Sequence, residues 1–173
     1  MAFTVDYSQA SELKPEGKYE VIVDKIKPSF TRKNTPCLNL VLTIRNDVSN
    51  PAGGKLFTSL YKKKEPTAAD RAVDGYSAAQ IQAWCKAARI ENGRRFESLE
   101  ELCAALTGAL VRVQLQHEEY NGRTMERVGP WPEQTAYPDC KHQGVNRGQF
   151  QTLPDTVTAQ DFTELENDED VPF

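Results

Sequence analysis

The feature that most constrains the fold is a strict period-two alternation between residues 38 and 45. Aliphatic side chains occupy every second position, at Leu38, Leu40, Leu42 and Ile44, and the positions between them carry Asn39, Val41, Thr43 and Arg45. Successive side chains of a β-strand point to opposite faces, so this spacing is typical of a strand with one buried and one outward face. It is the clearest strand signal in the chain and predicts a mainly β domain.

Weaker alternation predicts a strand on either side of this one. Before it, Tyr19, Val21 and Val23 alternate with polar residues, and Ile22 interrupts the pattern as in a tightly curved barrel strand. After it, the predicted inner positions are Leu56, Thr58 and Leu60, and the outer positions are Lys55, Phe57, Ser59 and Tyr61. Turn-forming residues separate these runs, so the first half of the chain predicts three consecutive strands.

The apolar spacing then changes to that of an amphipathic helix. Two such runs occur, one at Ile81, Trp84, Cys85 and Ala88, and one at Leu99, Leu102, Cys103 and Leu106. Ser77 and Ser98 each precede a Gln or Glu by three residues, which is the spacing of a capping box, and Gly108 closes the second run. We therefore expect a pair of helices, the first from Ser77 to Ile90, and expect Trp84 and Tyr19 to be core residues.

Alternation returns from Leu110 to Gln116, and Asn121-Gly122 predicts a tight hairpin turn into a fifth strand from Arg123 to about Val128. Trp131 could stack on a base, but a tryptophan near a barrel end more often closes the core, which is what we expect. Beyond Trp131 no periodicity remains. The predicted organisation is an N-terminal arm (1–17), a domain (18–132), a polar linker (133–150) and a disordered acidic tail (151–173).

Three strands, a helical insert and a two-stranded hairpin follow one another in the order of an OB-fold. That fold is a five-stranded, partly open barrel that binds oligonucleotides on strands 2 and 3 and on two loops. An immunoglobulin-like sandwich needs about seven strands and no helix pair, so it fits poorly. The predicted fold class is a mainly β, five-stranded OB-fold with a helix pair between strands 3 and 4.

The charges are distributed unevenly along the chain. Of its 25 acidic residues, seven lie between Gln151 and Phe173, where no Lys or Arg occurs, although the formal net charge is only −4. The remaining 18 acidic and 21 basic residues give the body a net charge of +3. A basic body with an acidic tail suggests a polyanion-binding domain whose tail competes with the ligand.

The tail ends in an acidic run followed by three apolar residues in a specific order: Asp168, Glu169, Asp170, Val171, Pro172 and Phe173. Phe173 carries both an aromatic ring and the terminal carboxylate, which an apolar pocket with a basic rim could capture. This tip resembles that of bacterial single-stranded DNA-binding proteins, with valine where those commonly have isoleucine. The resemblance implies recruitment of replication, recombination or repair proteins, and the other interpretation is a merely solubilising tail.

The body resembles phage-encoded single-stranded DNA-binding proteins of the OB type. The resemblance is carried by the runs 15–21, 38–40, 44–48, 96–99 and 111–123, which read PEGKYEV, LNL, IRNDV, FESL and VRVQLQHEEYNGR. It implies a role in an infected bacterial host, with single-stranded DNA as the ligand. The sequence has no stretch of about 18 apolar residues and no basic-then-apolar N-terminal signal, so we expect a cytoplasmic protein. Self-association is left open.

Binding of single strands without sequence preference needs cations for the phosphates and exposed rings for the bases. The candidate residues combine both types on the third strand, on the outward face of the second and in the predicted loops: Phe30, Arg32, Lys33, Arg45, Lys55, Phe57, Tyr61, Lys62, Lys63, Lys64, Tyr120 and Arg123. For Phe57 and the lysines, the alternative is a ring packed under the helices beside a solvated surface. Glu118 and Glu119 beside Tyr120 weaken the second-hairpin assignment.

Two other classes of function are alternatives to single-strand binding. One is an adaptor that uses its tail and binds no nucleic acid. The other is a metal-dependent nuclease built on His117, Glu118 and Glu119, with or without Asp74, but adjacent strand residues point to opposite faces and cannot converge on one metal centre. Cys140 and His142 form a lone C-x-H without the further ligands that zinc needs. We therefore expect no enzyme, no metal and no cofactor, and free thiols at the four cysteines.

Overall fold

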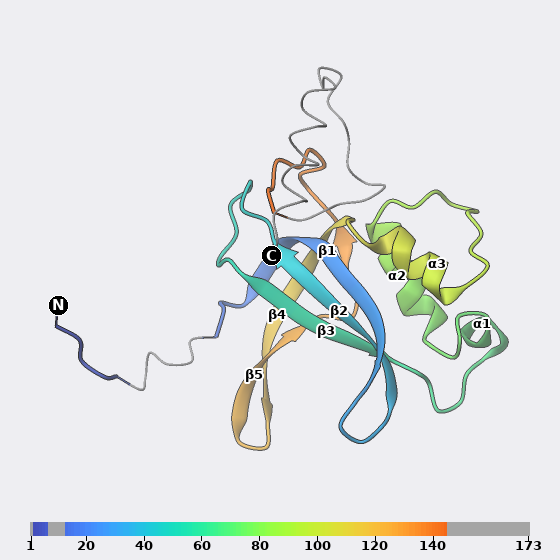
Figure 1. The fold of residues 1–173 in the computed structure, drawn as a ribbon, viewed down its shortest axis with the longest axis horizontal. Helices are drawn as coiled ribbons and strands as arrows, with labels where there is room; N and C mark the ends of the chain where they lie inside the picture. The colour runs from blue at the N-terminus through green and yellow to red at the C-terminus, as the bar shows by residue number, and fades with distance from the viewer. Residues whose placement is uncertain (1, 7–12, 145–173) are drawn as a thin grey trace, which may run out of the picture.

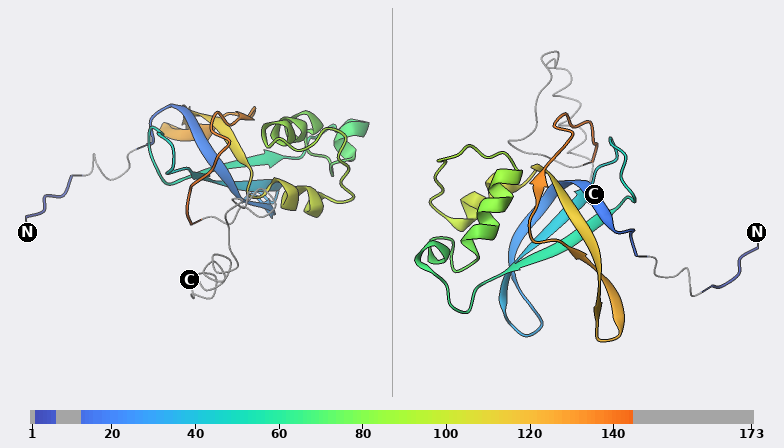
Figure 2. Two further views of the ribbon diagram at one scale, coloured as in Figure 1. Left: turned by 90° about the horizontal axis from the view of Figure 1, so that it is seen from above. Right: turned by 180° about the vertical axis from the view of Figure 1, so that it is seen from behind.

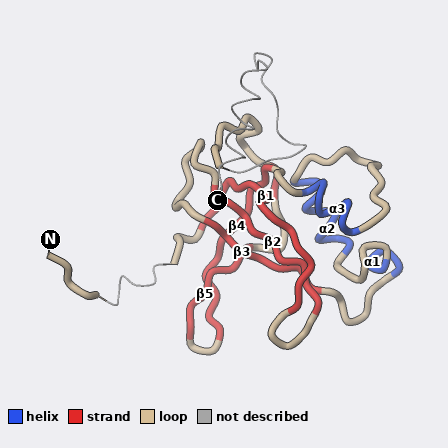
Figure 3. Tube along the Cα trace, viewed as in Figure 1, coloured by secondary structure: helices blue, strands red, loops and turns tan. Residues whose placement is uncertain are grey.

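The computed structural model describes residues 2–6 and 13–144, and it folds them around an antiparallel sheet with three helices (Figure 1). The strands are β1 (Gly17–Phe30), β2 (Pro36–Ile44), β3 (Lys55–Tyr61), β4 (Leu110–Tyr120), β5 (Arg123–Val128) and β6 (Glu133–Gln134). The helices are α1 (Ala68–Arg71), α2 (Ala78–Ala87) and α3 (Leu99–Leu106). Figure 3 shows that the helices gather beside the strands, so the expectation of a mainly β domain with a helical insert is confirmed.

The strands are ordered β3-β2-β1-β4-β5, and β6 pairs with β4. The sheet therefore has six strands in the described residues, one more than predicted, because the two-residue β6 carries no periodic signal of its own. β1 is long and central, and it pairs with β4 from Gly17 to Ile22 and with β2 from Val21 to Phe30. The sheet is strongly curved, since β3 and β5 lie at opposite ends of the pairing order and still contact each other (Figure 2).

The inner face of the sheet and one side of α2 and α3 form the hydrophobic core. The predicted inner residues of β2 are all buried, and so are Leu56 and Leu60 of β3. Tyr19 and Trp84 are core residues as predicted, with exposed fractions of 0% and 1%. Ile22 lies on the opposite face of β1 from Val21 and Val23 and is also fully buried, so β1 is covered on both faces at this point, which explains the broken alternation.

Both hairpins extend to the same end of the molecule in Figure 1. At the tip of the β4–β5 hairpin, Asn121 and Gly122 have φ values of 51° and 77°. Two consecutive positive φ values are the signature of a type I′ turn, whose twist matches that of the flanking strands. The Asn-Gly prediction is thus confirmed, and Tyr120 pairs with Arg123 across the turn.

The helical insert contains three helices, and the prediction of a pair missed α1. Ser77 and Ser98 cap α2 and α3 as predicted, accepting hydrogen bonds from the backbone N–H groups of Gln80 and Glu101 at 3.4 and 3.1 Å. α1 has only four residues, too few to show an amphipathic period, and Thr67 caps it. None of the helices in the described part of the chain is long and apolar enough to cross a membrane.

Residues 133–144, here called the C-terminal strap, pack against the sheet. β6 pairs with Val111 and Arg112 of β4, and Thr135 is 5% exposed. Sequence analysis placed these residues in a polar linker that begins at 133. The prediction missed their packing because polar hydrogen bonds hold most of the strap, and such bonds leave no apolar period in a sequence.

Candidate nucleic-acid interface

A β-bulge in β1 determines which lysines face outward. Val23 pairs with Leu42 of β2 and Lys25 pairs with the next residue, Val41, so Asp24 is an extra residue in β1. A bulge shifts the side-chain alternation by one position. As a result Lys25 and Lys27 point away from the core, where an unbroken alternation after Val23 would have turned them inward.

The outward sides of β1, β2 and β3 combine into one surface, three residues wide and three long, which we call the outer face. Paired residues of antiparallel strands share a face, so the register defines its three rows. They are Lys25–Val41–Phe57, Lys27–Asn39–Ser59 and Ser29–Cys37–Tyr61. Cations therefore lie along the β1 side of the outer face and aromatic rings along its β3 side.

The two rings on β3 are exposed, as the alternation predicted. Phe57 is 68% exposed and Tyr61 53%, while Leu56 and Leu60 between them are buried. The buried leucines hold the register, because a shift by one residue would turn both of them to solvent. The rings are therefore positioned by the core on the other side of the strand, and the alternative that Phe57 packs under the helices is wrong.

The lysines of this region differ in how they are paired. Within the described residues, Lys25 and Lys27 are exposed and form no ion pair. Lys55 Nζ lies 3.0 Å from Asp24 Oδ2, and Lys63 Nζ lies 3.2 Å from Asp70 Oδ2. Unpaired cations attract phosphate without first losing a protein partner, so Lys25 and Lys27, which sequence analysis did not select, are the better candidates.

Asp70 is held by the fold. The backbone N–H groups of Ala78 and Thr67 donate to its carboxylate, at 2.9 Å each, and these bonds together with Lys63 keep the pKa of Asp70 well below its usual range. Lys63 thus has a permanently charged partner. Lys62 Nζ lies 5.5 Å from the centroid of the Tyr76 ring, and Lys64 is exposed.

The two hairpins contribute the remaining predicted residues. Phe30, Arg32 and Lys33 are exposed at the β1–β2 tip, with Phe30 on the opposite face of the ribbon from Ser29 and Tyr61. Tyr120 and Arg123 are exposed at the β4–β5 tip. There Arg127 Nη1 lies 2.7 Å from Glu118 Oε2. This ion pair neutralises the charge of Glu118, one of the two carboxylates that weaken the assignment of the β4–β5 hairpin to the interface. The hairpin residues are thus exposed but do not join the outer face.

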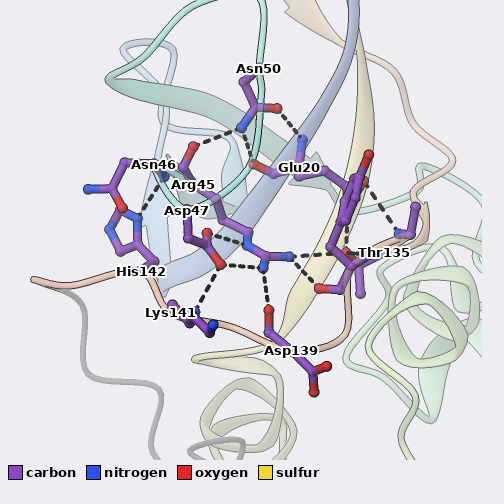
Figure 4. A network of polar contacts seen from close by, with 11 residues as sticks. Glu20, Arg45, Asn46, Asp47, Asn50, Thr135, Asp139, Lys141 and His142 are labelled. Atoms are coloured by element: carbon purple, nitrogen blue, oxygen red, sulfur yellow. Dashed lines mark hydrogen bonds and ion pairs between the residues drawn. The ribbon is translucent and has the colours of Figure 1, made fainter.

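Arg45 does not belong to this surface, and its prediction as a ligand-binding residue is wrong. It is 2% exposed and lies just after the last residue of β2. Its guanidinium donates to both Asp47 carboxylate oxygens at 2.9 and 2.7 Å, to Thr135 Oγ1 at 3.2 Å, and to the carbonyls of Tyr137 and Asp139 at 2.6 and 3.0 Å. All five of its donors are satisfied inside the protein (Figure 4).

Arg45, Asp47, Glu20, Asn50 and Thr135 form a network that we call the clasp. Thr135 Oγ1 donates to Glu20 Oε1, and the Asn50 amide donates to the Arg45 carbonyl at 2.8 Å while its oxygen accepts from the Glu20 N–H at 2.8 Å. Burial alone would raise the pKa of Asp47, but Arg45 and the N–H of residue 141 lower it to about 2. The hydrogen bonds of the clasp connect the strap to the sheet, and the charged groups of the clasp are buried.

In the strap, Cys140 is half-buried and His142 is engaged by the protein backbone. His142 Nδ1 accepts a hydrogen bond from the Asn46 N–H at 3.0 Å, and burial lowers the pKa of His142. No group of three potential metal ligands occurs within residues 2–6 and 13–144. The four cysteines carry free thiols, as expected.

Trp131 is exposed and does not close the core, contrary to the expectation. The acidic tip, Asp168 to Phe173, lies outside the described residues. A cavity of about 810 Å³ lies between α2, α3 and the loop that joins them, and its lining contains none of the predicted interface residues.

Comparison with known proteins places most of this architecture in one family. Residues 3–145, which include every described strand and helix, match a family described as a protein of unknown function, DUF669. A search of the curated proteins gave no match. The match covers the outer face and the clasp together and stops before the acidic tail, so the chain belongs to the DUF669 family through its folded body.

Proposed function

We propose that the protein binds single-stranded DNA with little sequence preference, on an OB-type barrel. The observation that carries the proposal is the outer face, where Lys25 and Lys27, which have no ion-pair partner among residues 2–6 and 13–144, lie two strands away from the exposed rings of Phe57 and Tyr61. Cations that follow a backbone beside rings on which bases stack are the recurring elements of sequence-tolerant single-strand binding.

The spacing of the outer face supports a single strand as ligand. Neighbouring strands lie about 4.8 Å apart, so the β1 lysines and the β3 rings are separated by roughly 10 Å. Phosphates can follow β1 while the attached bases reach over β2 to β3. In a duplex the bases are already stacked and paired, so Phe57 and Tyr61 would have no exposed base face to cover.

The topology supports the OB-type assignment. An antiparallel order of β3-β2-β1-β4-β5, contact between β3 and β5, and helices between β3 and β4 agree with the five-stranded, partly open barrel of that class. β6 is an addition to that plan. The face on β2 and β3 and the two hairpin loops are the places where the class binds oligonucleotides.

We propose further that the tail tip, Asp168 to Phe173, captures enzymes of replication, recombination or repair in a phage-infected cytoplasm. The specific sequence Val-Pro-Phe that follows the acidic run supports this role. Removing Phe173 alone keeps every acidic side chain of the tail. We therefore expect a pull-down with the Phe173-deleted protein to lose its partners while oligonucleotide binding is unchanged. Identical partner sets would reduce the tail to a solubilising segment.

The central experiment is a fluorescence titration of the full-length protein with oligo-dT and with a duplex of equal length at several salt concentrations. The molecular mass of the protein in solution is measured in parallel. We expect much tighter binding of oligo-dT, and a linear fall of log affinity with log salt of about −0.7 per contacted phosphate. Equal affinity for both ligands, or affinity independent of salt, would reject the proposal. Magnesium-dependent cleavage of the oligonucleotide would favour the nuclease instead.

A further inference from the structure

Asn39 occupies the centre of the outer face. It pairs with Lys27 of β1 on one side and with Ser59 of β3 on the other. Phe57 and Tyr61 flank Ser59 two residues away in each direction, so both rings are diagonal neighbours of Asn39. The Asn39 side chain is exposed, which places a polar amide between the lysines and the rings.

The amide oxygen of Asn39 faces two neighbouring side chains. Ser59 Oγ donates to Asn39 Oδ1 at 2.8 Å, and Cys37 Sγ donates to the same oxygen at 3.4 Å. A carbonyl oxygen has two lone pairs, so these two donors occupy it fully. The amide nitrogen carries two N–H donors, and neither has a partner among the described residues. Asn39 therefore presents donors, and no acceptor, to whatever lies on the outer face.

A free asparagine usually reads adenine with both atoms of its amide. The nitrogen donates to adenine N7 while the oxygen accepts from the N6 amino group. In this protein the oxygen is already engaged by Ser59 and Cys37, so the second half of that contact is lost. Adenine N7 can still accept from one Asn39 N–H, but adenine has no carbonyl oxygen for the second N–H, and its N6 amino group is itself a donor. Thymine, cytosine and guanine each carry a ring carbonyl oxygen that accepts from an N–H donor.

We propose that Asn39 is a specificity-determining residue that favours carbonyl-bearing bases over adenine at one position of the bound strand. The inference rests on the proposed function, since it needs a nucleic acid on the outer face. It predicts a base preference due to hydrogen bonding, distinct from preferences due to stacking strength. A pair of bases with similar ring systems but different acceptors can separate the two causes.

The test compares two oligonucleotides that are identical except that deoxyinosine replaces deoxyadenosine. Both bases are purines, and inosine has a carbonyl oxygen where adenine has its amino group. We expect the full-length protein to bind the inosine oligonucleotide about threefold to tenfold more tightly, as one net hydrogen bond implies. Asn39→Ala should reduce this ratio to about one, whereas Asn92→Ala, an exposed asparagine in the loop between α2 and α3, should leave it unchanged.

Ser59→Ala provides a second variant that keeps the amide. It removes the hydroxyl donor, so the amide oxygen becomes free to accept from adenine, and the ratio should fall because adenine is bound better. Equal affinities for the two oligonucleotides, or a ratio unchanged by Asn39→Ala, would overturn this inference alone. Failure to bind either oligonucleotide would overturn the proposed function as well. A thermal melt of each variant verifies that it is folded.

Discussion

The outer face and the clasp use basic residues in opposite ways. Both contain residues of β1, and the outer face also contains residues of β2, whereas the clasp contains Arg45, which directly follows β2. In the clasp, Arg45 is buried and all five of its donors have protein partners. On the outer face, Lys25 and Lys27 are exposed, and no carboxylate among the described residues pairs with them. A cation whose partners lie within the protein contributes to folding, and one without such partners remains available to a ligand.

The largest expected effect is the loss of stability when the clasp is broken. Arg45→Met leaves the Asp47 carboxylate buried and unpaired, which should lower the free energy of unfolding by about 3–5 kcal/mol. Urea denaturation measures the loss. Arg32→Met, an exposed arginine at the β1–β2 tip, is the control and should change stability by no more than about 0.5 kcal/mol. A stable Arg45 variant with weakened oligo-dT binding would return Arg45 to the interface and end the comparison.

Acid should weaken the clasp through Asp47. Its pKa is lowered from 3.8 to about 2 in the folded protein, so the folded state holds the charged form more strongly than the unfolded state does. The resulting stabilisation, about 2 kcal/mol, is present above pH 3.8 and is lost as the pH falls toward 2. Unfolding free energies measured across this range for the wild type and Asp47→Asn should converge at the acid end. Parallel curves would mean that Asp47 is not the titrating group.

On the outer face, substitutions should affect binding and leave stability intact. Phe57→Ala and Tyr61→Ala remove exposed rings, and each should weaken oligo-dT binding by at least about 1 kcal/mol with an unchanged melting temperature. Trp131→Ala also removes an exposed ring, but one between β5 and β6 that is not part of the three rows of the outer face, and it serves as the control. Were Trp131→Ala as damaging as Phe57→Ala, the stacking surface would have to extend beyond the outer face.

The smallest expected effect distinguishes unpaired from paired lysines. Lys27→Gln should reduce the magnitude of the salt slope by about 0.7, the contribution of one phosphate contact to single-strand binding. Lys55→Gln should reduce it less, because Lys55 already lies 3.0 Å from an Asp24 carboxylate oxygen. Oligo-dT titrations at four or more salt concentrations resolve the two slopes. If both variants lose the same amount, ion pairing within the protein does not determine which lysines bind phosphate.

Where one apolar period runs uninterrupted, the sequence was sufficient to predict local structure. The alternation from Leu38 to Ile44, the inner leucines of β3 and the Asn-Gly turn all occur as expected. Each of these signals depends on residues next to one another in the chain. The same holds for the serine caps of α2 and α3 and for the burial of Trp84.

The predictions failed where pairing between distant residues decided the outcome. The bulge at Asp24 reverses the alternation of β1 and turns Lys25 and Lys27 outward, yet it is defined only by the register with β2. The alternation of β2 predicts that Arg45 points outward with Asn39, Val41 and Thr43, and this placed it in the predicted interface. Its burial depends on Thr135 and on carbonyls about 90 residues further along the chain.

The sequence by itself determined five of the six described strands and two of the three described helices, how most of their faces divide between core and solvent, and where the basic and aromatic side chains of β3 point. Only the tertiary structure decided which cations are neutralised by the fold and which remain unpaired. The physical reason is that burial of a side chain follows the local period of a strand or helix. Pairing of a charge instead depends on the distance of a few ångströms to an oppositely charged or polar group, and that group can come from any part of the chain.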